Sequence, residues 1–262
     1  MAGRLRGMFD ELRGKRPALI TYATGYYPDR DASSGVIRAM LECGADAVEI
    51  GLPFSDPVLD GKVIQESSKV ALEAGANTPR MLELAEELRA GTEKPIMVMS
   101  YYNPVLKYGL ESFAQDAVGA GIDAAIIPDL PIEEMSPWKR ECDSAGLETV
   151  AFCSETTDRA RVKRAGDLSS GFLYCTSLLG TTGPREGVSV ELPAFIQRVR
   201  ENASCPIAVG LGISSPEQCR QVGSLADGVI VGSALVQTIS GNGRDLETLK
   251  RMVKEMAASL LI

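Results

Sequence analysis

Short apolar segments rich in β-branched residues recur along the whole chain, and amphipathic segments with helical spacing separate them. Near-continuous apolar runs are typical of parallel strands that are buried on both faces. Eight such strands, each followed by a helix, within about 250 residues predict an α/β fold of the (β/α)8 TIM-barrel type. An open doubly wound sheet also alternates strands and helices, so the count favours the barrel without excluding the sheet. The segments expected to form strands are 18–23, 46–51, 95–100, 123–128, 148–152, 171–176, 206–210 and 227–232.

The segments between these strands carry apolar residues three and four positions apart, as helices that cover a sheet do. One such stripe, at residues 36–41, is followed by Gly44, a residue type that favours the left-handed conformation at helix ends. Thr78 followed by Pro79 is a typical helix start. We expect an extra helix before the first strand. Since no segment divides the chain, residues 1–262 are predicted to form a single barrel domain.

The composition excludes several kinds of chemistry. With 27 Lys and Arg against 35 Asp and Glu, the net charge of −8 argues against a nucleic-acid-binding surface. The absence of histidine excludes Ser-His-Asp triads, Cys-His pairs and His-ligated zinc. The six cysteines are widely spaced, so we expect no metal site and no redox motif. Without an apolar leader or a membrane-length apolar run, the chain is expected to be cytoplasmic.

One acidic residue, Glu49, interrupts an apolar strand near the C-terminal end of that strand. In a (β/α)8 barrel, this end of the strands carries the active site. If Glu49 faces the barrel interior, its low-dielectric surroundings raise the carboxyl pKa and allow proton exchange near neutral pH. A buried glutamate that pairs with Arg or Lys is an equally good interpretation of the residue alone.

The connection after the second strand is predicted to be a long loop, with a short helical pattern at residues 64–74. Loops of this length in compact domains tend to be functional. The loop contains Asp56 and Asp60. As turn formers, these acids would bond nearby backbone amides. Alternatively, one of them faces Glu49 across a pocket and divides the acid and base roles with it.

Glycine-rich turns follow the last three strands. Gly212, Gly232 and Ser233 lie after the seventh and eighth strands, where barrels commonly bind phosphate through backbone N–H groups. The alternative is that these glycines serve tight turns only. The Gly/Thr-rich loop at residues 180–183 either closes over a ligand or is an ordinary surface loop.

The segment at residues 48–57, Val-Glu-Ile-Gly-Leu-Pro-Phe-Ser-Asp-Pro, resembles the signature of tryptophan synthase alpha chains. Further segments similar to that family follow in order and cover most of the chain. They lie at residues 60–65, 99–104, 128–131, 208–214 and 228–234. The last segment alone fits several phosphate-binding barrels, but the set as a whole is highly specific.

The resemblance implies a barrel lyase of tryptophan biosynthesis that cleaves indole-3-glycerol phosphate to indole and glyceraldehyde 3-phosphate. It implies that Glu49 is the general acid and base of this retro-aldol reaction and that Asp60 binds the indole N–H. One tunable carboxylate can give a proton to indole C3 and take one from the glycerol hydroxyl. The residues implied to bind the substrate are Tyr22, Tyr102, Tyr174 and Thr182. Those implied to bind its phosphate are Gly183, Gly212, Gly232 and Ser233.

The resemblance also implies a partner. Alpha chains of this family work with a beta chain in an alpha2-beta2 tetramer, and indole passes between the two sites. Pyridoxal phosphate is expected in the beta partner, with no cofactor or metal in this chain. The residues expected to face the partner are Pro53, Asp56, Asn103 and Pro104.

Departures from the family pattern at Lys62, Leu178 and Thr181 leave other functions open. One is a subunit that mainly activates its beta partner and turns over weakly itself. Another is a stand-alone lyase with no partner. A more distant one is a different phosphosugar barrel, such as an isomerase. Because Glu49 and Asp60 stand at the positions that match the family's acids, the catalytic alpha chain is favoured.

Overall fold

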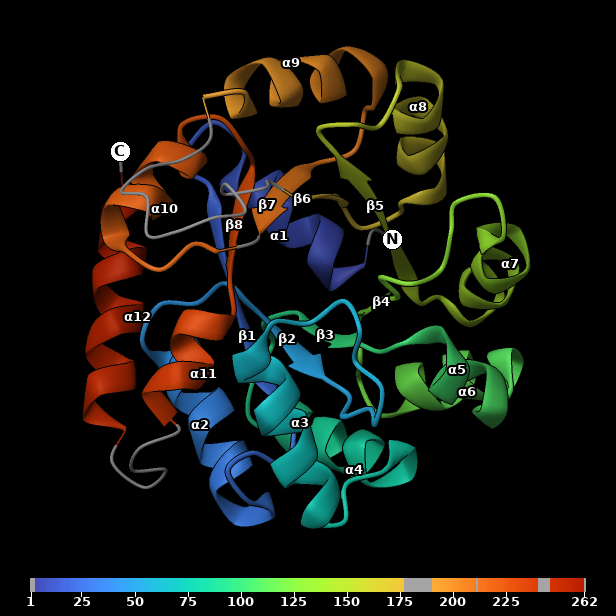
Figure 1. Cartoon of the computed structure of the whole chain (residues 1–262), viewed down its shortest axis with the longest axis vertical. Coiled ribbons are helices and arrows are strands. Elements are labelled where there is room, and N and C mark those ends of the chain that lie inside the picture. Colours follow the sequence, from blue (N-terminus) through green and yellow to red (C-terminus); the bar gives the residue numbers. More distant parts are fainter. Residues whose placement is uncertain (1–2, 177–189, 211, 240–245, 262) are drawn as a thin grey trace.

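A closed barrel of parallel strands forms the centre of the molecule (Figure 1). The computed structural model describes residues 3–176, 190–210, 212–239 and 246–261. Each strand pairs in parallel with the next along the chain, and the last pairs with the first, which confirms the predicted (β/α)8 barrel over the open sheet. The strands are β1 (Ala18–Thr24), β2 (Ala47–Gly51), β3 (Ile96–Met99), β4 (Ala124–Ile126), β5 (Glu148–Ser154), β6 (Leu173–Thr176), β7 (Ile207–Gly210) and β8 (Gly228–Val231).

Helices surround the barrel (Figure 1). The predicted start at Thr78 is confirmed, because the preceding Asn77 side chain accepts the N–H of Arg80. Gly44 has a φ of 117°, as its position after a helix end requires. Within the described residues, no helix has the length and apolarity that crossing a membrane requires. The helices are α1 (Arg4–Leu12), α2 (Arg30–Glu42), α3 (Lys62–Glu73), α4 (Thr78–Arg89), α5 (Tyr102–Tyr108), α6 (Leu110–Gly119), α7 (Met135–Ala145), α8 (Arg159–Leu168), α9 (Leu192–Asn202), α10 (Pro216–Gly223), α11 (Ser233–Ile239) and α12 (Glu247–Ser259).

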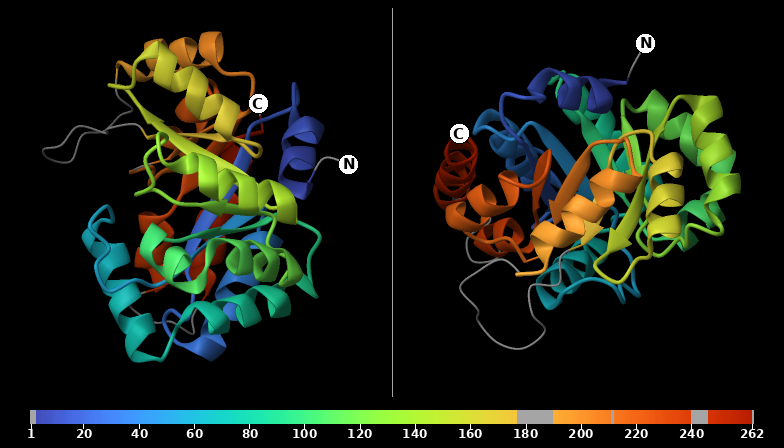
Figure 2. Two further views of the ribbon diagram at one scale, coloured as in Figure 1. Left: turned by 90° about the vertical axis from the view of Figure 1, so that its right-hand side faces the viewer. Right: turned by 90° about the horizontal axis from the view of Figure 1, so that it is seen from above.

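The N-terminal half of the barrel is filled by apolar side chains that alternate along the strands. Ala47 of β2 belongs to this inner cluster, so Glu49, two residues further on, faces the interior as well. Helix α1, the extra helix predicted before the first strand, closes this end with Leu5 and Phe9. Figure 2 shows α1 at one end of the barrel, outside the ring of helices. The opposite, C-terminal end is therefore the open one.

The N-terminal ends of the strands are tied by a contact that recurs before each even-numbered strand. A polar side chain there accepts a backbone N–H from the start of the preceding strand, at 2.8–2.9 Å. We call these four contacts the N-terminal clamps. They join Asp46 to Leu19, Asp123 to Ile96, Ser170 to Thr149 and Asp227 to Ile207. The three aspartates also form ion pairs with Arg16, Arg89 and Arg200, which adds stability at the barrel end away from the active site.

The predicted strand limits differ from the observed ones by at most two residues. Asp46, Asp123 and Asp227 were expected inside strands, but they precede them because their carboxylates serve the clamps. The connection after β2 begins with a loop at residues 52–61. The helical pattern predicted at residues 64–74 is confirmed as helix α3, which starts two residues earlier, at Lys62.

Candidate active site

Glu49 lies at the C-terminal end of β2 with its side chain inside the barrel. It is only 1% exposed, and it pairs in register with Tyr22 of β1. Among the described residues, no cation forms an ion pair with Glu49, and its Oε2 atom has no hydrogen-bond partner. Burial, with a smaller contribution from the nearby charge of Asp60, raises the pKa of the Glu49 carboxyl to about 8. The interpretation of Glu49 as half of a buried ion pair is therefore wrong for the described part of the chain.

Asp60 is held beside Glu49 by the loop after β2 and by α3. The Tyr101 hydroxyl donates to Asp60 Oδ2 at 3.2 Å and accepts the N–H of Leu59 at 2.9 Å. Gln65 on α3 donates its side-chain amide to the Asp60 carbonyl at 2.9 Å. Burial raises the pKa of the Asp60 carboxyl to about 6, although the Tyr101 hydrogen bond opposes the shift. The pair thus combines two carboxyl groups with different proton affinities, as acid–base division of labour requires.

Asp56, the other acid of the loop, points away from the site. It is exposed, and its carboxylate accepts the hydroxyl of the adjacent Ser55 at 2.5 Å instead of the backbone amide that a turn former would bond. Of the two aspartates that the sequence left open, only Asp60 therefore lies with Glu49.

Tyr22 and Tyr174 line the same end of the barrel interior, and their predicted contact with a substrate stays a prediction. Burial raises the pKa of both hydroxyls, and the charges of Glu49 and Asp60 add to it. Glycines on neighbouring strands leave room for them. A Cβ on Gly51 would lie 2.0 Å from the Tyr22 hydroxyl, and one on Gly210 would lie 2.3 Å from that of Tyr174. The Tyr174 ring also stacks on Phe152 with centroids 4.7 Å apart.

Replacing Gly51 with alanine is expected to displace the Tyr22 hydroxyl and to lower both stability and activity. The overlap must be relieved inside a packed barrel, which typically costs about 1–3 kcal/mol. Urea unfolding and indole release measure the two effects. Gly35→Ala is the matched control, because a Cβ at this helical position has no atom within 4 Å. If both variants had the same stability and the same rate of indole release, the space that Gly51 leaves for the Tyr22 hydroxyl would not be needed.

Tyr101, and not Tyr102, is the tyrosine that contacts the Asp60 carboxylate. Tyr102 is the first residue of α5, and its half-buried ring packs against the core outside the barrel. The ring of Tyr101 stacks on Phe54 with centroids 5.1 Å apart, and its hydroxyl reaches Asp60. The sequence carried a signal for this choice. Side chains alternate between the two faces of a strand, so Tyr101, four residues after the inward-facing Met97, also faces the barrel interior. A substrate contact by Tyr102 stays a prediction.

The residues predicted to bind phosphate follow β7 and β8, at the same end as Glu49. Gly212 has a φ of 75°, a left-handed conformation that favours glycine. Gly232 lies beside Tyr22, because a Cβ on it would be 3.4 Å from the Tyr22 Cβ. Ser233 begins α11. Thr182 and Gly183 lie outside the described residues, so the complete phosphate site stays a prediction.

The residues predicted to face a partner differ in exposure. Asp56 and Asn103 are exposed, Pro104 is half-buried, and Pro53 is buried. Within this chain, Pro53 therefore offers no surface to a partner.

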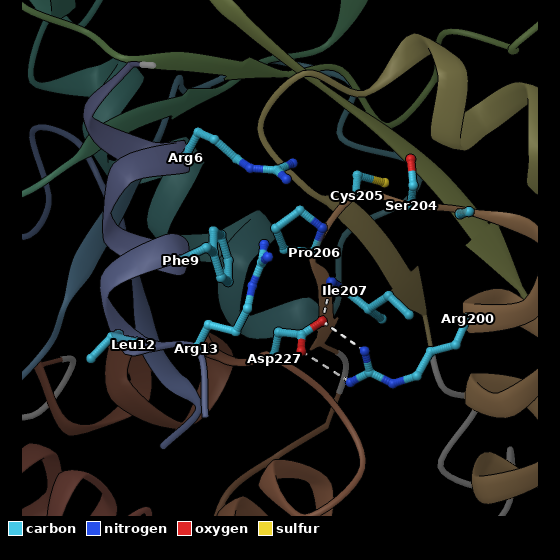
Figure 3. Close-up of a pocket in the computed structure, with 11 residues that line it drawn as sticks. Arg6, Phe9, Leu12, Arg13, Arg200, Ser204, Cys205, Pro206, Ile207 and Asp227 are labelled. Atoms are coloured by element: carbon cyan, nitrogen blue, oxygen red, sulfur yellow. Dashed lines mark hydrogen bonds and ion pairs between the residues drawn. The ribbon is translucent and has the colours of Figure 1, made fainter. Parts of the chain in front are cut away.

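A hollow of about 460 Å³ lies at the other end of the barrel, between α1 and the segments before β7 and β8 (Figure 3). Arg6 and Arg13 of α1 project toward it, and Arg200 is held by Asp227 of the N-terminal clamp. Since none of its lining residues belongs to the carboxylate site, the hollow is separate from it.

A closed (β/α)8 barrel that carries a buried and a half-buried carboxyl group at its C-terminal end is typical of a barrel enzyme with an acid–base site. The family model described as tryptophan synthase alpha chain matches residues 9–260. The chain belongs to this family. Membership confirms the resemblance seen in the sequence, together with the role of alpha subunit in tryptophan biosynthesis and the class of lyase.

Individual relatives agree with this assignment. The tryptophan synthase alpha chain of Geobacter sulfurreducens is 41% identical over 258 residues, which cover 96% of this chain and 98% of the relative. A chain of Mycobacterium tuberculosis tryptophan synthase superposes with a TM-score of 0.91 at 35% identity, covering 100% of both chains. The tryptophan synthase alpha subunit of Legionella pneumophila superposes with a TM-score of 0.92 at 31% identity, covering 99% of both.

Proposed function

We propose that this chain cleaves indole-3-glycerol phosphate to indole and glyceraldehyde 3-phosphate, with Glu49 as general acid and base. The observation that carries the proposal is the buried Glu49 carboxyl, which lies without a cationic partner among the described residues and beside Asp60. A carboxyl with a pKa of about 8 holds a proton at neutral pH and can release it to a substrate carbon.

The reaction then follows from the two carboxyl groups. Glu49 gives its proton to indole C3, and the ring acquires a positive charge at nitrogen. The Asp60 carboxylate accepts a hydrogen bond from the indole N–H group and stabilises this charge. Glu49, now ionised, takes the proton of the glycerol hydroxyl next to the ring. The carbon–carbon bond breaks, its electron pair returns to the ring, and the aldehyde and indole leave. Gly183, Gly212, Gly232 and Ser233 would hold the phosphate and keep the reacting bond in place.

The pH profile of kcat/KM is expected to be bell-shaped. Activity rises as the Asp60 carboxyl, with a pKa of about 6, ionises. It falls as the Glu49 carboxyl, with a pKa of about 8, loses the proton that the first step needs. Initial rates of indole release between pH 5 and 9.5 measure both limbs. A profile that only rises through pH 8 would mean that Glu49 must start as a base.

The chain is proposed to work in the cytoplasm as part of an alpha2-beta2 tetramer, whose beta subunit carries pyridoxal phosphate. Exposed apolar side chains on the loop after β2 and on α5 support a partner surface there. Val58, Leu59 and Leu106 are 78%, 57% and 53% exposed. The Leu59–Tyr101 hydrogen bond joins the two segments, so that a partner bound here would touch the loop of Asp60.

Indole release from indole-3-glycerol phosphate by the purified chain, alone and with a tryptophan synthase beta chain, tests the proposal. We expect slow release alone and a large increase with the partner. Strong activation of the beta reaction with negligible cleavage would favour the partner-activating subunit. Fast release without any gain would favour the stand-alone lyase. No release in either condition would refute the proposal. Of the departures behind these alternatives, Lys62 begins α3 at the surface, whereas Leu178 and Thr181 lie outside the described residues.

A further inference from the structure

Three hydroxyl groups form a buried chain beside Glu49. The Tyr22 hydroxyl lies 3.3 Å from Thr24 Oγ1, which lies 2.7 Å from Ser67 Oγ. Ser67 Oγ in turn donates to the carbonyl oxygen of Ile64 at 2.9 Å. Tyr22, Thr24 and Ser67 are all at most 5% exposed. These three hydroxyl groups therefore link strand β1, which lies next to Glu49, with helix α3.

The direction of these hydrogen bonds is fixed by the carbonyl at their end. Each hydroxyl has one proton to donate, and a carbonyl can only accept. Because Ser67 uses its proton on the Ile64 carbonyl, it accepts from Thr24. Thr24 has then used its own proton, so it accepts from Tyr22. The Tyr22 hydroxyl is left with lone pairs and no free proton.

The Tyr22 oxygen lies among the acidic groups of the site. The charges that act on it are those of Asp60 and Glu49, together with the Tyr101 hydroxyl. Within the described part of the chain, no group donates a hydrogen bond to it. The Tyr22 oxygen therefore keeps a lone pair that can accept a hydrogen bond from a bound molecule with a hydroxyl group.

We propose that the Tyr22 hydroxyl oxygen accepts a hydrogen bond from a hydroxyl of the substrate's glycerol chain. Thr24 and Ser67 are positioning residues that keep it an acceptor. The inference rests on the proposed function and adds a specificity-determining residue to it. Tyr22 selects a ligand that places a hydroxyl donor next to Glu49 over one that lacks this group.

Helix α3 connects the Tyr22 hydroxyl oxygen with Asp60. Gln65 holds the backbone of Asp60, and Ser67, two residues further on, holds Thr24. One helix therefore sets both the position of Asp60 and the hydrogen-bonding state of Tyr22. Without Ser67, the Thr24 hydroxyl can turn toward Tyr22, and the Tyr22 proton becomes free to point into the site.

Two ligands separate hydroxyl recognition from general shape. One is indole-3-glycerol phosphate, assayed by kcat/KM for indole release. The other is indole-3-propanol phosphate, which keeps the ring and the phosphate but lacks both glycerol hydroxyls, assayed by calorimetric Kd. Tyr22→Phe is expected to lower kcat/KM about 3- to 10-fold, the effect of one neutral hydrogen bond, and to leave the Kd of the analogue unchanged. Ser67→Ala is expected to act in the same direction. Ser68→Ala, at a buried serine of the same helix that is not in the hydroxyl chain, is the matched control.

The outcomes distinguish this inference from the proposed function. A Tyr22→Phe variant that keeps wild-type kcat/KM overturns the inference alone, and so does one that weakens both ligands equally. Equal losses in Ser67→Ala and Ser68→Ala overturn the positioning role of Ser67. A wild-type chain that binds the analogue but never releases indole overturns the proposed function, and the inference falls with it.

Discussion

Replacing Glu49 with glutamine is expected to lower the rate of indole release about 10²- to 10⁴-fold, the usual contribution of a general acid or base. Glutamine has nearly the same shape as protonated glutamate, but it cannot give or take the proton. The side chain is buried, and its pKa of about 8 means that the wild-type carboxyl is mostly neutral at pH 7. The fold should therefore accept the amide without loss of stability at that pH.

Unfolding at several pH values supplies an independent readout for the same variant. A carboxyl whose pKa is raised by folding, from 4.5 to about 8 here, binds its proton more tightly in the folded chain. Its contribution to stability is complete below pH 4.5 and is lost as the pH rises through 8. Glu49→Gln should remove this loss, so the variant gains on the wild type toward pH 9. Glu83→Gln, on the exposed face of α4, is the control for both measurements. Near-wild-type cleavage by Glu49→Gln would contradict its acid–base role.

Replacing Asp60 with asparagine is expected to lower the rate about 10²- to 10³-fold, as the loss of one group that stabilises developing charge does. The amide keeps the size of the side chain but not the charge that faces the indole nitrogen. Since the Asp60 charge also helps to raise the pKa of Glu49, the alkaline limb of the pH profile should move to lower pH.

Rates of the Asp60→Asn variant across the pH range test both statements together. Asp31→Asn is a suitable control, because this carboxylate on α2 is 93% exposed. A lower rate with an unmoved alkaline limb would mean that the two carboxyl groups do not interact as the structure indicates.

The sequence was most informative where one residue contradicts its surroundings. Eight apolar runs predicted the barrel, and Glu49 was conspicuous because a carboxylate interrupts such a run. Nearby residues of the same type were harder to separate. Asp56 and Asp60 lie in one loop, and only the folded loop shows that Asp60 alone lies near Glu49. For Tyr101 and Tyr102, the alternation along β3 does separate the inward residue from its neighbour. The Thr24–Ser67 bond joins residues that are far apart in the sequence, and only the packing of α3 on β1 reveals it.

The N-terminal clamps group the strands of the barrel into four pairs. In each pair, a side chain just before the second strand accepts a hydrogen bond from the backbone of the first. All four N-terminal clamps lie at the end of the barrel away from Glu49 and Asp60. The side chains that tie these strand pairs are thus distinct from those of the acid–base site. Such a division leaves the reactive rim free to diverge. Substitutions at the rim of the acid–base site can therefore alter substrate choice or partner response without changing the four contacts that tie the strand pairs.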